Sequence, residues 1–241
     1  MNIKIMTYNI QHGLDYKKLL NKERIIDLDR ICEIIKQENP DILGLNEVYN
    51  DVNNIETVEQ TKYIASKLGY DYYFFGKSIT IKNTIGYGNA IVSRYPIIDV
   101  KLHNIEDPLV KDEDVYYETR SIIEVSIKIN DKIINTFVSH FGLAKSEQLN
   151  ATNKLLSLIK DKQTIFIGDL NMEETNENIK EISKALVNTS YLIDRNKETY
   201  PSINPMIKID YIFTKNVGNI DSKIIKEIGS DHFPVVSNII I

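Results

Sequence analysis

Apolar and polar residues along the chain form short segments of two kinds, separated by Gly, Pro, Asp and Asn. The runs 41–45, 89–93 and 164–167 are rich in Ile, Leu and Val and bounded by turn residues, which predicts buried β-strands. Segments 121–129 and 132–139 alternate apolar with polar residues on both sides of a short Asn-Asp-Lys turn. This alternation predicts a β-hairpin and not a helical crossover.

Three other segments repeat apolar residues at helical spacing. Segment 25–35 precedes a proline that stops the element, and segment 58–68 ends at a glycine. The third, 146–160, places Leu149 on an apolar face and begins at Ser146, which suits an N-cap. A chain that mixes helical crossovers with antiparallel hairpins favours sheets that pack face to face and are covered by helices.

Length and composition favour one folded domain. The 241 residues lie at the upper end of what one hydrophobic core supports, and 42% hydrophobic with 26% charged residues is ordinary for a folded protein. Because the chain has no internal repeat, linker or block of like charge, we expect a single domain over residues 1–241. Cys32 falls within a helical apolar pattern, so we expect a core residue and no internal disulfide.

Charge and hydropathy limit the partners and the location. The formal net charge of -5 argues against a surface that binds nucleic acid over its whole extent, because that binding relies on Lys and Arg. It is compatible with a local basic rim. No segment reaches the ~18 apolar residues of a membrane-spanning helix, and the first ten residues alternate like a strand instead of forming a signal peptide. We therefore expect a cytoplasmic monomer without a transmembrane segment, and a leader cleaved earlier would be compatible with the same sequence.

The polar residues that suggest chemistry lie where apolar strand runs begin or end. In chain order they are Asn9, Glu47, His140, Asp169, Asn171, Asp210, Asp231 and His232. Strand ends are rigid positions from which side chains can meet in one pocket. Each residue alone has an ordinary structural interpretation, such as a turn former or a solvated acid. Their combination supplies the hard oxygen ligands that Mg²⁺ prefers, together with imidazoles.

Around these residues the chain resembles a known family. The blocks 7–10, 46–48, 87–97, 118–120, 139–142, 168–171, 209–213 and 230–235 follow one another as in the endonuclease/exonuclease/phosphatase superfamily, which includes deoxyribonuclease I. The chain is most similar to the compact bacterial metal-dependent hydrolases of that superfamily, in which His12-Gly13 is also typical. The resemblance implies a four-layer α/β/β/α sandwich of two packed, mainly antiparallel mixed sheets, with the polar residues at one end.

The resemblance also implies a metal-dependent phosphoesterase. Glu47 would be the main Mg²⁺ ligand, with Mn²⁺ as a substitute, and Asn9 would bind the metal or its waters. Whether one or two ions bind stays open. Asp169 would orient or deprotonate the attacking water, and Asn171 would hold that water or a phosphate oxygen.

Both histidines would then act on the phosphate. His140 and His232 are expected to donate to its oxygens, which requires carboxylate partners. Asp231 is a poor partner for His232, since neighbouring side chains of an extended chain point to opposite faces. Asp210 is the better candidate and could hold either histidine. Asp231 would then serve the metal or the water.

Three further residues are candidates for substrate binding. Arg120 is expected to clamp phosphate at the rim or to form a structural ion pair, and Asn89 and Tyr87 either contact substrate or support the residues that do. Two departures from the family pattern bear on this region. Asn46 stands where Gln usually precedes the metal-binding glutamate, and Thr119 and Ser121 flank Arg120 where Pro and Gly are common, which leaves the loop geometry open.

The substrate is less well defined than the reaction. A small soluble or head-group-like phosphodiester is the first expectation, because the chain is acidic and has no apparent aromatic hairpin for membrane insertion. A DNA or RNA endonuclease or exonuclease is the second. The third alternative is a non-catalytic binding module on the same fold, and the complete set of polar residues argues against it.

Overall fold

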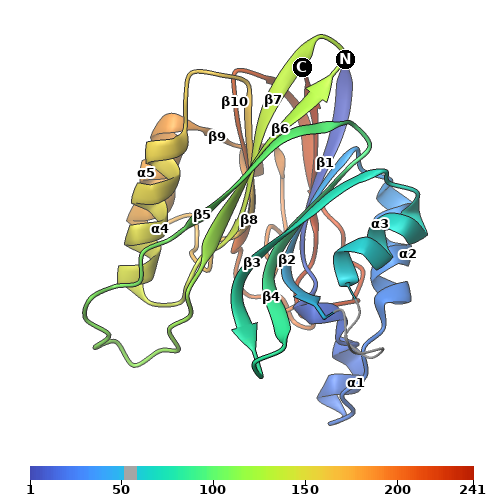
Figure 1. The fold of residues 1–241 in the computed structure, drawn as a ribbon, viewed down its shortest axis with the longest axis vertical. Coiled ribbons are helices and arrows are strands. Elements are labelled where there is room, and N and C mark those ends of the chain that lie inside the picture. The colour runs from blue at the N-terminus through green and yellow to red at the C-terminus, as the bar shows by residue number, and fades with distance from the viewer. Residues whose placement is uncertain (52–58) are drawn as a thin grey trace.

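The computed structural model describes residues 1–51 and 59–241, which form two six-stranded sheets packed face to face with helices outside (Figure 1). The first sheet has the order β11-β12-β1-β2-β4-β3. Its strands are β11 (Gly218–Ile224), β12 (Val235–Ile240), β1 (Asn2–Asn9), β2 (Ile42–Asn50), β4 (Ile85–Ser93) and β3 (Tyr72–Ile81). Only β1 and β2 pair in parallel, so this sheet is mixed and mainly antiparallel, as predicted.

The second sheet repeats this arrangement. Its order is β5-β6-β7-β8-β10-β9, and only β7 and β8 pair in parallel. The strands are β5 (Ile97–Asn104), β6 (Ser121–Ile129), β7 (Lys132–His140), β8 (Thr164–Asp169), β10 (Asp210–Lys215) and β9 (Val187–Asn188). The predicted hairpin is β6 and β7, joined across Asn130, whose positive φ of 53° suits a tight turn.

Helices cover both outer faces, which completes the predicted four layers. The helices α2 (Leu28–Glu38) and α3 (Gln60–Leu68) lie on the first sheet, and α4 (Lys145–Leu158) and α5 (Glu177–Ala185) lie on the second (Figure 1). The short elements are α1 (Tyr16–Leu20) and the 3₁₀ turns η1 (Gln11–Gly13) and η2 (Thr189–Leu192). None of the helices within the described residues is long and apolar enough to cross a membrane.

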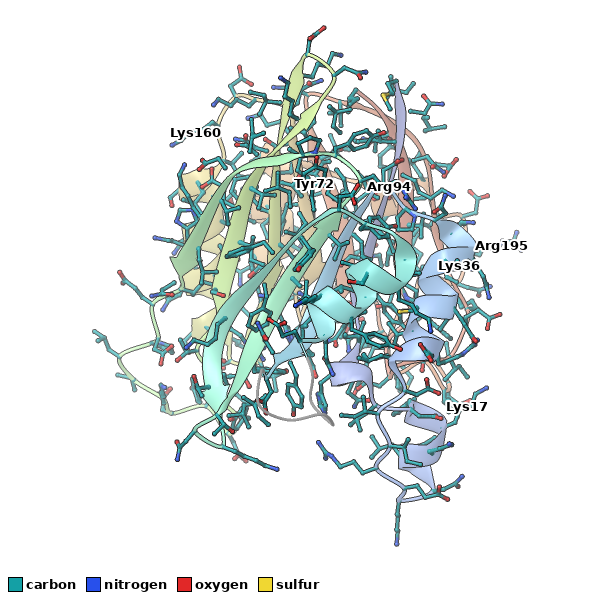
Figure 2. The ribbon with its side chains drawn as sticks, turned by 45° about the vertical axis from the view of Figure 1, so that its right-hand side comes forward. Lys17, Lys36, Tyr72, Arg94, Lys160 and Arg195 are labelled. Carbon is teal, nitrogen blue, oxygen red and sulfur yellow. The ribbon has the colours of Figure 1, made fainter. Side chains whose placement is uncertain are left out.

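Strand periodicity explains why the core has three parts. Along β8, Ile165 and Ile167 face the other sheet while Phe166 faces α4 and α5. Along β1, Ile5 faces inward, and Tyr8 packs with the helices of the first sheet. Central strands such as β4 and β8 are thus buried on both faces, which accounts for their apolar runs, whereas the edge strand β5 is largely exposed. Figure 2 shows side chains filling the space between the layers, with charged ones such as Lys17, Lys36 and Lys160 projecting outward.

One expected helix start differs from the structure, and a second lies outside the described residues. The first helix begins at Leu28, because Asp27 accepts from the Arg30 N–H as its N-cap, and Ile26 instead forms a β-bridge with Leu14. Residue 58, where the second helix was expected to begin, lies outside the described residues. That helix ends as predicted, with Gly69 in the left-handed conformation at φ 71°.

The third helix was predicted with the wrong cap and one misplaced apolar residue. It begins at Lys145, and Ala144 occupies the N-cap position, where Glu147 accepts from the Ala144 N–H at 3.2 Å. The Ser146 hydroxyl donates to Glu113 at 2.8 Å instead of capping the helix. Leu149 is 51% exposed, because the buried face consists of Ala151, Leu155 and polar residues and not of the leucines alone.

The strand register brings separate polar residues to one end of the sandwich. The termini meet at the other end, where the Met1 N–H donates to the Ile241 carbonyl at 3.0 Å (Figure 1). Since β1 and β2 run parallel, Asn9 at the carboxyl end of β1 lies beside Asn46 in the middle of β2. In the second sheet, His140 at the end of β7 is opposite Asp169 at the end of β8.

Candidate active site

Asp169 is the centre of the candidate site. It ends β8 and pairs in register with both His140 and Asp210, the first residue of β10. Its Oδ2 accepts from Asn9 Nδ2 at 3.0 Å and lies 3.5 Å from His140 Nε2 and 3.6 Å from His232 Nε2. Two imidazoles and an amide from three different strands and loops therefore converge on one oxygen atom.

The pKa of the Asp169 carboxyl is raised above its ordinary value in water. Burial raises the pKa of this carboxyl to about 7; His232 and the Asn9 and Asn171 hydrogen bonds oppose the rise, and Asp210 adds to it. The Asn171 backbone N–H donates to Asp169 Oδ1 at 2.9 Å, which fixes the carboxylate plane. Asn171 itself has a positive φ of 51°, so the backbone turns sharply just after the strand.

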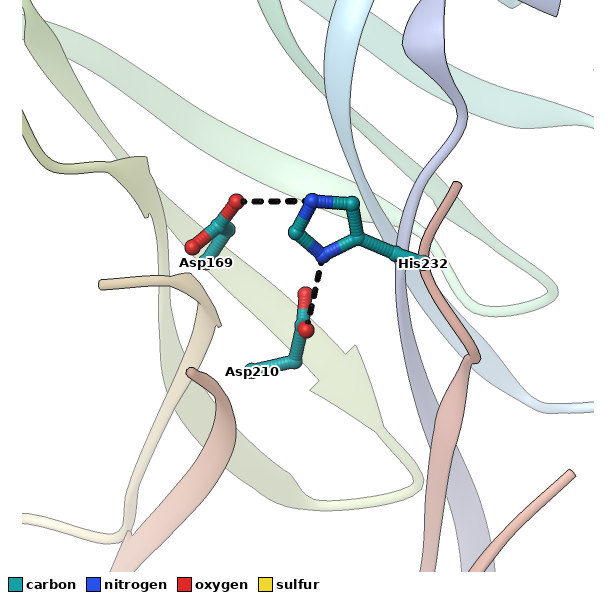
Figure 3. Close-up of side chains that lie close together, drawn as sticks. All are labelled: Asp169, Asp210 and His232. Atoms are coloured by element: carbon teal, nitrogen blue, oxygen red, sulfur yellow. Dashed lines mark hydrogen bonds and ion pairs between the residues drawn. The ribbon is translucent and has the colours of Figure 1, made fainter. Parts of the chain in front are cut away.

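His232 pairs with Asp210, which resolves the alternative that the sequence left open. His232 Nδ1 lies 2.9 Å from Asp210 Oδ2, and both side chains are almost fully buried (Figure 3). Burial disfavours the imidazolium, but Asp210, Asp169 and Asp231 outweigh it and raise the pKa of His232 to about 10. His232 is therefore held as a cation whose Nε2 faces Asp169.

Asp231 does not hold its neighbour in the chain, as expected from the geometry of extended backbone. Its Oδ2 accepts from Gln11 Nε2 at 2.9 Å, and its Oδ1 accepts from the Ser230 hydroxyl at 3.0 Å. Burial raises the pKa of Asp231 to about 6; His232 opposes this and Glu47 adds to it. Asp231 and Glu47 are thus close enough for their negative charges to disfavour each other.

His140 has a different environment from His232. Its Nδ1 lies 2.8 Å from Arg120 Nη1, and its Nε2 lies 3.0 Å from Asn171 Nδ2. Burial lowers the pKa of His140 well below its ordinary value, and the charges of Arg120 and His232 lower it further. At neutral pH the site therefore contains one neutral and one cationic histidine.

Glu47 reaches the site through a bulge in β2. Asn46 and Glu47 together oppose Asn89 of β4, and Glu47 adopts a positive φ of 57°. This kink turns the Glu47 carboxylate toward β1, where Asn9 Nδ2 donates to Oε1 at 3.1 Å. Asn9 thus links Glu47 with Asp169 through one amide group.

His12 supports the same region, and its role was not predicted. Its ring stacks on Tyr49 at a centroid distance of 4.3 Å, and its Nδ1 lies 3.9 Å from Glu47 Oε2. Burial lowers the pKa of His12 to about 4; Glu47 opposes the change and Arg24 adds to it. The sequence had one signal for it, the family-typical His12-Gly13 after the first strand.

Asn46 and Asn89 join the two sheets beneath the site. Asn46 Nδ2 donates to Asn89 Oδ1 at 2.8 Å and to the Ser139 carbonyl at 3.0 Å, while its Oδ1 accepts from the Asp169 N–H at 3.0 Å. Asn89 Nδ2 donates to the Ser121 carbonyl at 3.3 Å. Because both amides are buried, Asn89 supports the site and does not form its surface. Asn46, which stands in the place of the usual Gln, thus uses both its amide nitrogen and its amide oxygen in hydrogen bonds.

The side chains of Tyr87 and Arg120 are also largely buried, whereas residues that bind substrate at a rim would be exposed. Tyr87 is buried and packs edge-on against Tyr49 at 5.8 Å, and burial raises the pKa of its hydroxyl, as do Glu47 and Glu118. Arg120 forms the ion pair that the sequence left as an alternative, with Glu118 Oε1 2.7 Å from its Nη1.

Two groups of side chains could hold a metal ion. In the first, Asp169, Asp210 and His232 place one ligand atom each within 4.8 Å of one another. A protonated imidazole has no free lone pair for a metal, however, and His232 Nδ1 is already bound to Asp210. This group is therefore better described as a hydrogen-bonded charge cluster.

The second group fits a divalent cation better. The Glu47 side chain remains 22% exposed, and the neighbouring Asp231 has a raised pKa, so a cation would relieve the repulsion between the two carboxylates. Gln11 Oε1 is buried and has no hydrogen-bond partner among the described residues. Carboxylate and amide oxygens of this kind are the donor set that Mg²⁺ accepts, usually together with several waters.

The two-sheet sandwich and the histidine, carboxylate and amide cluster at its end define a hydrolase of phosphoester bonds. The model of the Endonuclease/Exonuclease/phosphatase family matches residues 6–232, so the chain belongs to that family. No curated protein sequence matches the chain significantly.

Solved structures of low sequence identity share the fold. An endonuclease/exonuclease/phosphatase from Beutenbergia cavernae is 20% identical, with a TM-score of 0.85 over 100% of this chain and 72% of the other. A mannosyl-6-phosphatase from Bacteroides thetaiotaomicron is 17% identical, with a TM-score of 0.75 over 99% of this chain and 100% of the other. The human Nocturnin catalytic domain with bound sulfate is 17% identical, with a TM-score of 0.72 over 99% of this chain and 93% of the other.

Proposed function

We propose that the protein is a Mg²⁺-dependent phosphodiesterase that hydrolyses a small soluble or head-group-like substrate by water attack. The observation that carries this proposal is the convergence of His140 Nε2, His232 Nε2 and Asn9 Nδ2 on Asp169 Oδ2, beside the accessible carboxylate of Glu47. Such a cluster combines an acceptor for the proton of water with donors for the oxygens of a phosphate.

Asp169 is the group that orients the water and takes its proton. A pKa of about 7 suits a general base, because the group is partly ionised at neutral pH and still binds a proton well. Asn171, whose Nδ2 donates to the Phe141 carbonyl at 3.0 Å, lies beside the same carboxylate and holds the water or a phosphate oxygen.

The two histidines donate to the phosphate with different charges. His232 donates Nε2–H as a cation, because Asp210 retains the proton on Nδ1. His140 donates as a neutral imidazole. A phosphorane-like transition state gains negative charge on its oxygens, so donors that are already in place stabilise it without reorganisation.

Glu47, Asn9 and Asp231 form the proposed Mg²⁺ site, with Mn²⁺ as a substitute. When bound, the ion supplies charge neutralisation at a non-bridging oxygen of the phosphate. Asn9 keeps the Glu47 carboxylate in place through its hydrogen bond to Oε1. Gln11, which donates to Asp231, does the same for the second carboxylate.

The acidic net charge and the buried position of Arg120 support a small phosphodiester over a long nucleic acid, which needs an extended basic surface. The test compares hydrolysis of bis-p-nitrophenyl phosphate, p-nitrophenyl phosphate and supercoiled plasmid DNA, with Mg²⁺ and with excess chelator. We expect Mg²⁺-dependent turnover that is fastest on the diester. Glu33→Ala, which changes an exposed glutamate on α2, is the control for Glu47→Ala.

Undiminished hydrolysis in chelator would contradict the metal dependence. Plasmid cleavage that is faster than hydrolysis of the small diester would favour the nuclease alternative instead.

A further inference from the structure

The Arg120 guanidinium lies between Glu118 and His140. Its Nη1 is 2.7 Å from Glu118 Oε1 and 2.8 Å from His140 Nδ1. The side chains of Glu118 and Arg120 are each only 11% exposed. The carboxylate, the guanidinium and the imidazole thus form one buried series that ends at the site.

The contact with Arg120 determines which nitrogen of His140 carries the proton. A guanidinium only donates hydrogen bonds, so His140 Nδ1 must be the acceptor. A neutral imidazole has one acceptor nitrogen and one N–H. The proton of His140 is therefore on Nε2, because a proton on Nδ1 would set an N–H against the N–H of Arg120.

Asn171 does not overturn this assignment. Its Nδ2 lies 3.0 Å from His140 Nε2, so a proton on Nε2 faces one N–H of this neutral amide, whose other N–H donates to the Phe141 carbonyl at 3.0 Å. Hydrogen bonds from charged donors are about twice as strong as those between neutral groups. The stronger hydrogen bond from Arg120 therefore makes Nδ1 the acceptor nitrogen of His140. The proton on Nε2 can then be donated to an anionic oxygen such as Asp169 Oδ2, which lies 3.5 Å away.

Glu118 keeps Arg120 in place. A buried guanidinium requires a carboxylate partner, and removing one partner of such a pair is strongly destabilising for the charge that remains. The backbone of Glu118 is itself fixed, because its N–H donates to Glu147 Oε1 at 2.9 Å in the first turn of α4. The position of Arg120 thus depends on contacts that lie outside the reacting centre.

We propose that Glu118 and Arg120 are positioning residues that hold His140 with its proton on Nε2, so that this N–H is presented to the scissile phosphate. The part that concerns phosphate rests on the proposed function. Arg120 then acts through His140 and not as a direct clamp on the substrate. A direct clamp would leave the tautomer of His140 independent of Arg120.

The first test determines the tautomer by NMR and needs no substrate. Long-range ¹H–¹⁵N spectra of the protein labelled with ¹⁵N-histidine distinguish protonated from unprotonated ring nitrogens. We expect His140 to be neutral with its proton on Nε2 at pH 7.5. Glu118→Gln and Arg120→Met should convert this signal to a mixture of tautomers, and the control Arg94→Met should leave it unchanged.

Assignment of the signal uses His140→Gln. If that variant does not fold, His12→Gln, His103→Gln and His232→Gln assign it by elimination among the four histidines. A proton on Nδ1 of His140 in the wild-type protein would overturn the proposal, as would a signal that stays unchanged in Arg120→Met.

The second test is a double-mutant cycle in the kinetics of phosphodiester hydrolysis. Arg120→Met and Glu118→Gln should lower kcat about 10–100-fold, as for other residues that orient an active-site imidazole, with little change in KM. In a His140→Ala background, Arg120→Met should change kcat by no more than about twofold, because its effect passes through His140. Losses that multiply, or a rise in KM alone, would identify a direct clamp and overturn the proposal.

The two tests separate this proposal from the proposed function. If the protein hydrolyses no phosphodiester, the proposed function fails while the NMR result still decides the tautomer. If hydrolysis requires Mg²⁺ but the tautomer is wrong, only the role of Glu118 and Arg120 fails.

Discussion

Asp210→Asn tests how the protein maintains the charge of His232. Asp210 Oδ2 lies 2.9 Å from His232 Nδ1, and the nearby carboxylates raise the pKa of His232 from 6.5 to about 10 against the effect of burial. Since one pKa unit corresponds to ~1.4 kcal/mol, the surroundings favour the imidazolium by roughly 5 kcal/mol. Removing one partner of a buried ion pair typically costs ~3–5 kcal/mol.

The substitution should convert His232 to a neutral imidazole at moderately alkaline pH. Loss of one close opposite charge typically lowers the pKa of a histidine by ~1–3 units. At pH 8–9 we therefore expect kcat for bis-p-nitrophenyl phosphate to fall by ~10²–10³, the usual cost of one preorganised donor. The assay is the pH profile of kcat from 6 to 10, together with an NMR titration of His232.

Stability should change with pH in a defined direction. A group whose folded-state pKa is above its unfolded value stabilises the fold fully below the unfolded pKa, and this contribution is lost as the pH rises through the folded pKa. For His232 the window therefore runs from 6.5 to about 10. The wild-type protein should exceed Asp210→Asn in free energy of unfolding near pH 6, and the part of this difference that depends on the His232 charge should be lost above pH 10.

A double-mutant cycle supplies the control. Adding Asp210→Asn to His232→Ala should lower kcat little further, because Asp210 acts through its hydrogen bond to His232. Adding it to His140→Ala should instead multiply the two losses in kcat. Full activity of Asp210→Asn at pH 9, or non-additivity with His140 instead of His232, would refute the assignment.

Three further predictions concern the metal, a backbone position and a donor. Glu47→Ala should abolish Mg²⁺-dependent turnover with an unchanged melting temperature, measured against Glu33→Ala; activity at low Mg²⁺ would count against it. Gly168→Ala should cost ~1–3 kcal/mol in denaturant unfolding, because its Cβ would overlap the Ser139 carbonyl oxygen, whereas Gly218→Ala meets only ordinary contacts. His140→Ala should lower kcat by ~10²–10³ with little effect on KM in steady-state assays; early melting with a normal kcat would instead indicate a structural histidine.

The layers and strands of the fold could be predicted because each strand carries its own signal. The Ile-rich runs of β8 and β4 and the alternation of β6 and β7 are local patterns, and a period of two determines which side chains face the other sheet. The pairing order was not available from such patterns. It depends on which sheet each strand joins, and the resemblance to a known family implied only the two packed sheets and not the order of their strands.

Helix ends were predicted less well, since several residues compete for each cap. Ser146 has the right side chain for an N-cap, but its hydroxyl donates a hydrogen bond to Glu113, which is 33 residues away in the sequence. Ala144 occupies the N-cap position instead, and its N–H donates to the carboxylate of Glu147. A long-range contact has overridden a local preference, and a sequence window around the helix start does not contain the residue responsible.

Supporting residues of the site were missed for a similar reason. Strand ends identified Asp169 and Glu47, because an acid after an apolar run is visible in the sequence. Asn46 seemed to be only a shortened replacement of Gln, yet it joins β2, β4, β7 and β8 through three hydrogen bonds. The sequence shows that an amide stands at this position but not that it joins four strands.

The two histidines show most clearly what sequence position leaves undetermined. Both lie beside strand ends, and their Nε2 atoms lie 3.5 and 3.6 Å from the same oxygen of Asp169. They differ at Nδ1, where His232 meets the carboxylate of Asp210 and His140 meets the guanidinium of Arg120. A carboxylate retains a second proton on the ring, while a guanidinium excludes it. Burial disfavours the cation of both histidines, and the charge of each then depends on a partner about 20 residues away in the sequence, 22 for His232 and 20 for His140.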